Sequence, residues 1–277
     1  MPWQPSPDWQ PLTPGTGQAT GGVWRAPDGQ VVKRLVPGVT EPRHHAYWER
    51  QALVAESGVV ARTPGLRSPA CRGVERDAGG ITLRMAYTSP AGWTPGDLAE
   101  ALGRFGACFV VEPAWGARDV LRERLRTVER RGGWAPLARA GLASPAVEEL
   151  WARRESALAV LDGLPRVPTH GDAHTVNLLG RDGDDVIAVD WEQFGLGPSG
   201  FDLGYLLLAT DVPLDDLIAA HGGDRTSGAV RCGAALVAAY TGVSRAAWAL
   251  TQDDPGDHVE RLVRLSAVVD EAVSHAS

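Results

Sequence analysis

Residues 169–180, THGDAHTVNLLG, carry several side chains whose types and spacing could do chemistry. His170, Asp172 and His174 alternate, and in an extended strand they would face one side, as the ligands of a metal ion could. The same stretch places Asn177 five residues after Asp172, an arrangement that suits phosphoryl transfer. No other pair of histidines stands at an obvious strand end. A metal-dependent hydrolase is therefore the weaker of the two hypotheses.

The residues that follow predict a β-hairpin that completes a phosphotransfer site. In NLLGRDGDDVIAVD, a turn at Asp182-Gly183 reverses the chain and returns Asp190 to the side of Asn177. The oxygens of these two side chains suit Mg²⁺, which prefers carboxylate and phosphate oxygens. Asp172 is then left to orient an attacking hydroxyl group and to accept its proton.

HGDAHTVN followed by AVDWEQFGLGPSGFDLG resembles the aminoglycoside phosphotransferase family, a relative of the protein kinases. The shared signature is His-Gly-Asp with Asn five residues later, then Asp-Trp-Glu after a strand, then Gly-Pro and Asp-Leu. It covers residues 170–204 closely and the remainder only by layout. The resemblance implies that Asp172 is the catalytic base and that Asn177 and Asp190 are Mg²⁺ ligands.

Four further residues of the signature receive supporting roles by this resemblance. His170 is expected to hold the loop by hydrogen bonds, and His174 to be structural or peripheral. Glu192 could touch metal or substrate, or support them from behind. Asp202 stands at the start of a predicted helix, where an N-terminal cap or a buried structural acid is the favoured interpretation.

The family's small lobe also needs a strand lysine for the nucleotide phosphates and a helix glutamate to pair with it. Lys33, in the strand-like VVKRL, is the only lysine of the chain, and its ammonium group can act on two phosphates as a point charge. Glu49 is its expected partner, because it shares a helix face with apolar residues. TGQATGG, residues 16–22, is the expected loop over the phosphates, although it lacks a GxGxxG pattern.

The layout predicts an α+β, two-lobed protein-kinase-like fold with a small β-rich N-lobe and a larger, mostly helical C-lobe. Residues 1–87 form the expected nucleotide-binding lobe: a hairpin over 22–35, a helix over 43–57 with Thr40 as its N-cap, and two strands between 68 and 87. Residues 88–97, with two prolines and two glycines, are the expected hinge. Residues 98–277 form the expected catalytic and substrate-binding lobe.

The composition is that of an ordinary globular protein. The chain has 277 residues, 44% of them hydrophobic and 22% charged. A net charge of −7 argues against general nucleic-acid binding, which needs a basic face. The three separated cysteines, the lack of a signal-peptide pattern and the lack of an apolar run of spanning length predict a cytoplasmic protein without a membrane partner. We expect a monomer or homodimer.

The expected reaction moves the γ-phosphoryl group of ATP, possibly GTP, with Mg²⁺ to a hydroxyl of a small molecule. The resemblance favours an antibiotic such as an aminoglycoside, and a sugar, choline or an amino alcohol is the alternative acceptor. A catalytically idle nucleotide-binding regulatory protein is an alternative of another class, against which the complete set of expected site residues speaks. Six aspartates could bind the ammonium groups of an aminoglycoside, although such acids are usually solvated. They are Asp211, Asp215, Asp216, Asp253, Asp254 and Asp257.

Overall fold

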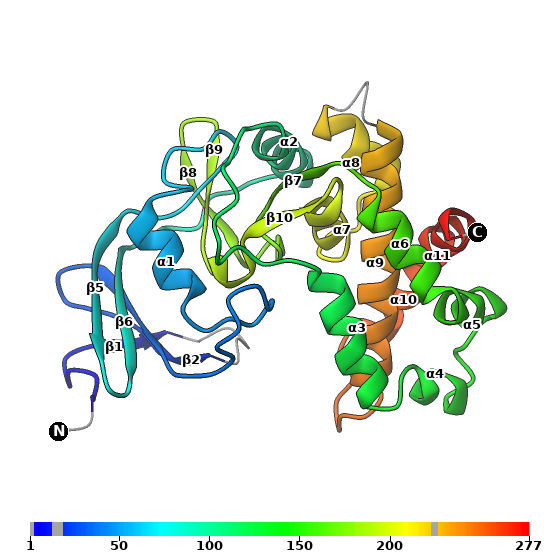
Figure 1. The fold of residues 1–277 in the computed structure, drawn as a ribbon, viewed down its shortest axis with the longest axis horizontal. Helices are drawn as coiled ribbons and strands as arrows, with labels where there is room; N and C mark the ends of the chain where they lie inside the picture. Colours follow the sequence, from blue (N-terminus) through cyan, green and yellow to red (C-terminus); the bar gives the residue numbers. More distant parts are fainter. Residues whose placement is uncertain (1–2, 13–18, 223–226, 277) are drawn as a thin grey trace.

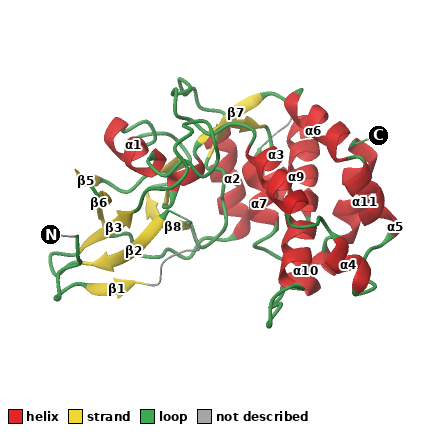
Figure 2. Cartoon of the chain, turned by 60° about the horizontal axis from the view of Figure 1, so that its bottom comes forward, coloured by secondary structure: helices red, strands yellow, loops and turns green. Residues whose placement is uncertain are grey.

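Two lobes, one rich in strands and the other mostly helical, make up the computed structural model (Figure 1). It describes residues 3–12, 19–222 and 227–276. Figure 2 shows the yellow strands β1, β2, β3, β5 and β6 gathered toward the N-terminal end and most of the red helices at the other. The predicted α+β, two-lobed architecture is therefore confirmed.

The smaller lobe is built on a five-stranded antiparallel sheet with the strand order β1-β2-β3-β6-β5. The predicted hairpin over 22–35 turns at Asp28-Gly29, where Gly29 supplies the left-handed residue (φ 82°) that the turn requires, and the two strands predicted between 68 and 87 pair with each other. β3 is the central strand, and Lys33 on it lies opposite Val23 and Leu83. The elements are β1 (Gln10–Leu12), β2 (Thr20–Arg25), β3 (Gln30–Leu35), α1 (Arg50–Ser57), β5 (Cys71–Asp77) and β6 (Gly80–Ala86).

The helix of the smaller lobe is shorter than predicted. Residues 41–49 form turns, and α1 begins only at Arg50, so the predicted start near residue 43 is wrong. The fully buried guanidinium group of Arg50 gives the reason, because it collects five backbone carbonyls, three of them from this segment. Carbonyls that point at a side chain are turned away from a helix axis. The five acceptors belong to Pro42, His44, His45, Trp115 and Glu192.

The larger lobe opens with α2 (Pro95–Gly106), after residues 87–94, which have no regular secondary structure. A capping box starts this helix: the Thr94 hydroxyl accepts from the Asp97 amide, and the Asp97 carboxylate accepts from the Thr94 amide. The helix therefore begins inside the segment 88–97 that the sequence suggests as a hinge.

The rest of the larger lobe consists of one hairpin on the side of the smaller lobe, a second strand pair and most of the helices (Figure 1). The predicted hairpin is formed by β8 (Leu178–Asp182) and β9 (Asp185–Ala188), and the short β4 (Leu66–Arg67) pairs with β9 in parallel. A second pair joins β7 (Arg166–Thr169) to β10 (Gly195–Pro198). The helices are α3 (Val120–Arg130), α4 (Ala135–Arg139), α5 (Pro145–Ala152), α6 (Arg154–Asp162), η1 (Trp191–Gln193), α7 (Phe201–Leu207), α8 (Leu214–His221), α9 (Ser227–Ala249), α10 (His258–Arg264) and α11 (Ser266–His275).

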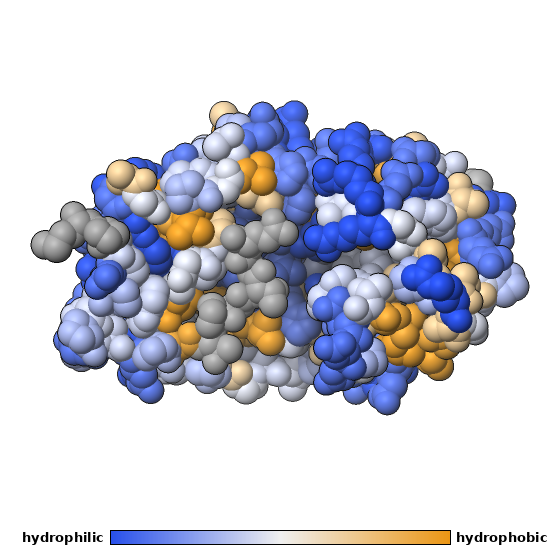
Figure 3. Space-filling view, turned by 90° about the horizontal axis from the view of Figure 1, so that it is seen from below, coloured by the Kyte–Doolittle hydropathy of each residue, from blue (hydrophilic) through white to orange (hydrophobic). Residues whose placement is uncertain are grey.

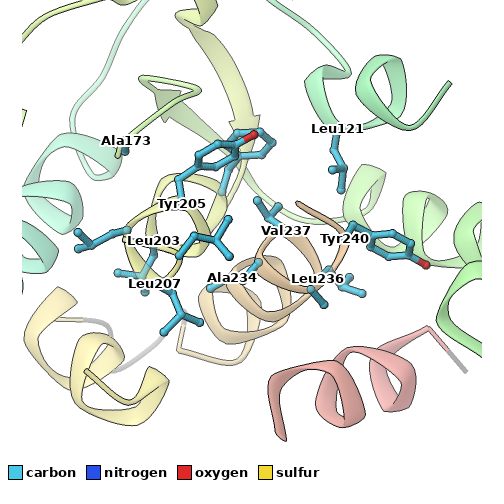
Figure 4. Close-up of a cluster of buried hydrophobic side chains, with 14 of the residues drawn as sticks. Leu121, Ala173, Leu203, Tyr205, Leu207, Ala234, Leu236, Val237 and Tyr240 are labelled. Carbon is cyan, nitrogen blue, oxygen red and sulfur yellow. The ribbon is translucent and has the colours of Figure 1, made fainter. Parts of the chain in front are cut away.

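The core of this lobe lies where α7 packs against α9. Figure 4 shows Leu203 and Leu207 of α7 beside Ala234 and Val237 of α9, all of them buried. The close approach depends on Gly204, since a Cβ atom there would lie 2.8 Å from the Ala234 carbonyl oxygen. None of the helices in the described parts of the chain is both long and apolar enough to cross a lipid bilayer.

Candidate active site

An ion pair joins the two lobes at the expected site. The Nζ atom of Lys33, in the centre of β3, lies 2.7 Å from Oδ1 of Asp190, which follows β9. Asp190 has left-handed backbone angles (φ 64°, ψ 51°), which are uncommon for a residue other than glycine. Its partner, Lys33, is buried. The ion pair thus holds the Asp190 carboxylate, at the end of the hairpin, against the smaller lobe, which the sequence predicts to bind the nucleotide.

Asp172 and Asn177 face each other within one loop. The Asn177 side-chain amide donates to the Asp172 backbone carbonyl (2.9 Å) and to its carboxylate (3.1 Å). Because only the nitrogen of the Asn177 amide can donate, these bonds fix its orientation and leave its oxygen for another partner. The side chain of Asp172 keeps 29% of its surface exposed. It is therefore accessible to a small molecule in the cleft.

A buried acid, Asp202, accepts hydrogen bonds from the backbone of the loop that carries Asp172. The two carboxylate oxygens of Asp202 accept the amide hydrogens of His170 (2.7 Å) and Gly171 (2.9 Å). Burial raises the pKa of Asp202, whereas His170 and the two amide donors act in the opposite direction. Gly171 has φ 83°, and a Cβ atom there would lie 2.5 Å from the Gln193 carbonyl oxygen. The Gly of the His-Gly-Asp motif is thus required by local geometry.

His170 uses both ring nitrogens within this loop. Its Nε2 lies 2.8 Å from the Val189 carbonyl oxygen, and its Nδ1 accepts the Asp172 amide at 3.3 Å. His174 is partly buried, and its Nδ1 accepts the Val176 amide at 3.4 Å. Burial is the main cause that lowers the pKa of His174. These bonds give no support to a metal strand of alternating histidines.

Among the described residues, one group of His, Cys, Asp or Glu side chains could hold a metal ion by proximity, and it lies elsewhere. It consists of His44, His45 and Glu123, whose ligand atoms lie within 4.8 Å of one another. The Glu123 carboxylate already accepts from the His45 amide (2.7 Å) and contacts the His45 ring (2.9 Å). This group contains neither of the expected Mg²⁺ ligands, Asn177 and Asp190.

Glu49 and Glu192 lie in different surroundings. Glu49 occupies the N-cap position of α1 without a side-chain capping bond, near Tyr47 and Arg76. Within the described ranges Lys33 pairs with Asp190 and not with Glu49. Glu192 lines the cleft, and burial, followed by the charge of Asp190, raises its pKa to about 7. The expected loop over the phosphates, residues 16–22, lies partly outside the described residues.

A cleft of about 760 Å³ brings these groups together. Residues from both lobes line it, and its lining includes Asp172, Asn177, Asp190 and Glu192. Seen from below, the surface is hollowed between the lobes, and the visible walls of the hollow are mostly hydrophilic (Figure 3). The cleft thus offers an accessible carboxylate and further side-chain oxygen ligands, and the buried ammonium group of Lys33 contacts one of them, Asp190.

Sequence reasoning missed two arginines of this cleft. Arg124 of α3 donates to the Gln193 side-chain oxygen at 2.5 Å, and Arg245 of α9 lies 3.9 Å from Asp172. Arg124 lies in an arginine-rich helix, and no feature of the neighbouring sequence distinguishes it from the other arginines there. Arg245 is one of two charged residues in the long apolar helix α9, and that isolation was the available signal.

Comparisons with known proteins identify the family and the fold of the chain. The model of a family described as the phosphotransferase enzyme family matches residues 27–236. A choline/ethanolamine kinase family protein from Mesorhizobium loti has a similar structure, with a TM-score of 0.64 and 19% identity over 97% of this chain and 90% of that chain. No curated protein matches the chain by sequence.

Two structures of aminoglycoside-modifying enzymes are also similar. The GDP and kanamycin complex of APH(2")-IIIa gives a TM-score of 0.60 at 14% identity, over 97% of this chain and 93% of that one. The GDP complex of aminoglycoside 2'-phosphotransferase-IIIa gives 0.59 at 13% identity, over 96% and 92%. At such identities the likeness establishes the fold.

Proposed function

The chain belongs to the phosphotransferase enzyme family, and from this premise we propose that it moves the γ-phosphoryl group of ATP or GTP to a hydroxyl group of a small molecule. The observation that carries the proposal is that Asp172, Asn177 and Asp190 line one cleft, with Lys33 in contact with Asp190. Structurally similar proteins that were solved as complexes with GDP, ADP or ATP support the use of a nucleotide.

In this proposal the two lobes bind different substrates. Residues 1–87 hold the nucleotide, with Lys33 near its phosphates, residues 88–97 connect the lobes, and residues 98–277 carry the catalytic loop and the acceptor. Lys33 also holds Asp190 through the 2.7 Å ion pair. A compact ammonium group can serve a carboxylate and a phosphate oxygen together, since it has three donors.

Asp172 is the proposed base. Its carboxylate lines the cleft and is partly exposed, and Asn177 fixes it through one side-chain hydrogen bond. A carboxylate so placed can orient a hydroxyl group and take up its proton as the oxygen attacks phosphorus. His170 and Asp202 keep the loop in place through bonds to its backbone. They act as positioning residues.

Asn177 and Asp190 suit Mg²⁺. The Asn177 amide oxygen has no hydrogen-bond donor recorded among the described residues, and Asp190 offers a second carboxylate oxygen beyond the one that Lys33 contacts. Both are hard oxygen ligands of the kind that Mg²⁺ takes. Bound there, the ion would neutralise charge on the nucleotide phosphates. Asp190 lies close enough to Glu192 for its charge to raise the pKa of Glu192, so we assign Glu192 a supporting role.

The acceptor expected from the sequence, an aminoglycoside, finds less support. None of the six aspartates predicted to bind its ammonium groups is among the described residues that line the cleft. Asp211 pairs with Arg264 (3.2 Å), Asp215 with Arg231, and Asp257 with Arg261. A small metabolite is therefore the favoured acceptor class. Solved neighbours with gentamicin, streptomycin or kanamycin keep antibiotics in the test panel.

The proposed function is tested by nucleotide turnover with a panel of hydroxylated acceptors. The panel holds sugars, sugar acids, sugar phosphates, amino alcohols, choline and antibiotics, each with ATP and with GTP. We expect acceptor-dependent release of nucleoside diphosphate by the wild type and its loss in Asp172→Ala. Nucleotide binding without turnover on any acceptor would instead favour an idle regulatory protein.

A further inference from the structure

We propose that the acceptor is a hydroxylated anion, a small molecule that carries a carboxylate or phosphate group, and that Arg124 and Arg245 bind this group. The inference rests on the proposed phosphotransferase function, which it makes more specific. It starts from the charged side chains that line the cleft around Asp172.

The cleft lining contains more arginines than carboxylates, and the carboxylates already have proposed roles in the reaction. Its three carboxylates, those of Asp172, Asp190 and Glu192, already have proposed roles as base, metal ligand and support. Four arginines share the lining: Arg124, Arg130, Arg131 and Arg245. A cationic acceptor would therefore meet guanidinium groups where it needs carboxylates.

Arg124 forms no ion pair at contact distance in the described part of the chain, although the charges of Asp172 and Glu192 act on it from farther away. Its one side-chain hydrogen bond among the described residues goes to the neutral Gln193 side chain. The guanidinium group lies 4.9 Å from the centre of the Tyr205 ring. Burial lowers the pKa of Arg124 to about 10. Keeping a partly buried cation without an anion in direct contact is costly, and an anion bound to it would lower that cost.

Arg245 brings a second cation to the same place. It lies 5.4 Å from the centre of the same Tyr205 ring, and its charge contributes to lowering the pKa of Arg124. Two guanidinium groups on one aromatic ring repel each other, and an anion between them relieves the repulsion. Arg245 is also 3.9 Å from Asp172. An acceptor whose anionic group contacts these arginines would thus present a neighbouring hydroxyl to the proposed base.

The first test measures binding with matched sets of acceptors. One set contains D-gluconate, glucose 6-phosphate, glucose and glucosamine; the other contains D-glycerate, glycerol and ethanolamine, and choline and kanamycin are added singly. Titration calorimetry with Mg²⁺ and ADP present gives a Kd for each. In at least one set we expect an anion to bind about tenfold or more tightly than its neutral relative. Gluconate against glucose 6-phosphate separates a carboxylate from a phosphate ligand.

The second test assigns the selectivity to the two arginines. In Arg124→Met and in Arg245→Met, the affinity for the anion divided by the affinity for its neutral relative should fall toward one. Arg126→Met is the matched control, because Arg126 lies on the same helix, is exposed and is outside the cleft lining. Its ratio should stay at the wild-type value. Arg124→Lys, which keeps the charge, should retain part of the selectivity.

Three results would overturn the inference: tightest binding by a neutral or cationic compound, no binding by any anion, or an unchanged ratio in both arginine variants. A raised KM for ATP with an unchanged ratio would assign the arginines to the nucleotide. Failure of the proposed function looks different. Arginine-dependent anion binding without phosphoryl transfer to any acceptor would refute the phosphotransferase activity and leave the anion site standing.

Discussion

The side chains of Lys33 and Asp190 lie 2.7 Å apart although 157 residues separate them in the chain. Lys33 stands on the central strand of the smaller lobe and Asp190 at the end of the hairpin in the larger one. Their side chains keep 7% and 20% of their surface exposed. The pair therefore joins the two lobes at the point where we propose that the nucleotide phosphates bind.

Replacing Lys33 with Met tests this pair. The variant loses the ammonium group and leaves Asp190 without its cation, so kcat/KM for the nucleotide should fall by about a hundredfold or more. Because the two side chains act as a unit, Lys33→Met combined with Asp190→Asn should be little worse than the more damaging single variant. Steady-state kinetics of the three variants check this expectation.

The control for this cycle is Arg67→Met, which removes ion pairs to Asp182 and Asp185 of the same hairpin. None of these three residues lines the cleft, so kcat/KM should stay within about twofold of the wild type. Additive losses in the Lys33 and Asp190 variants would show that the two residues act independently.

Metal dependence tests Asn177 and Asp190. Activity should disappear with a chelator and return with Mg²⁺. Asp190→Asn and Asn177→Ala should each raise the Mg²⁺ concentration for half-maximal rate by about tenfold or more, since each weakens an oxygen ligand. Initial rates over a Mg²⁺ series measure this, with Asp182→Asn in the hairpin turn as control. A wild-type Mg²⁺ dependence in both variants would remove these residues from the metal site.

Arg50 should be the costliest arginine to replace. In Arg50→Met, five backbone carbonyls lose a charged donor, and the free energy of unfolding should fall by about 3–5 kcal/mol. Arg50→Lys should recover only part, because an ammonium group has three donors in place of five. Urea unfolding measures both variants.

A matched comparison is Arg76→Met. This change breaks an exposed ion pair between Arg76 of β5 and Glu56 of α1, the helix that carries Arg50. Its loss should stay below about 1 kcal/mol. Equal losses for Arg50 and Arg76 would contradict the role given to the buried guanidinium group.

His221 should make stability depend on pH. Burial lowers the pKa of His221 below its ordinary 6.5, and its Nδ1 has no hydrogen-bond partner in the described structure. Below pH 6.5 the unfolded chain therefore binds a proton that the folded chain excludes, and the free energy of unfolding falls as the pH decreases. Replacing the ring with Leu removes this contribution.

The measurement compares wild type with His221→Leu by urea unfolding at pH 8 and pH 5.5. Between these values the wild type should lose more stability than the variant. Parallel losses would mean that His221 takes up its proton as easily in the folded chain as in the unfolded one.

Local patterns were sufficient where neighbours in the chain decide the structure. The turn residues Asp28-Gly29 and Asp182-Gly183, with alternating apolar residues around them, predicted both hairpins correctly. The start of α1 was missed because a tertiary contact, the carbonyl cage around Arg50, overrides the helical pattern before it.

The candidate site shows the same division. The spacing of Asp172 and Asn177 within one loop was visible in the sequence, and the structure joins them directly. Whether Lys33 pairs with Glu49 or Asp190 depends on how the lobes meet, which no local pattern reports. The cleft positions of Arg124 and Arg245 likewise depend on the packing of α3 and α9 around Tyr205.

Direct transfer of the γ-phosphoryl group tests the central claim. With nucleotide labelled at the γ-phosphate and the best acceptor of the panel, a single-turnover experiment follows the label in wild type and Asp172→Asn. We predict that the label moves to the acceptor hydroxyl, and that the variant is slower by about 10²–10⁴-fold with nucleotide affinity retained. Label found only in inorganic phosphate, or equal transfer rates in the two proteins, would contradict the account.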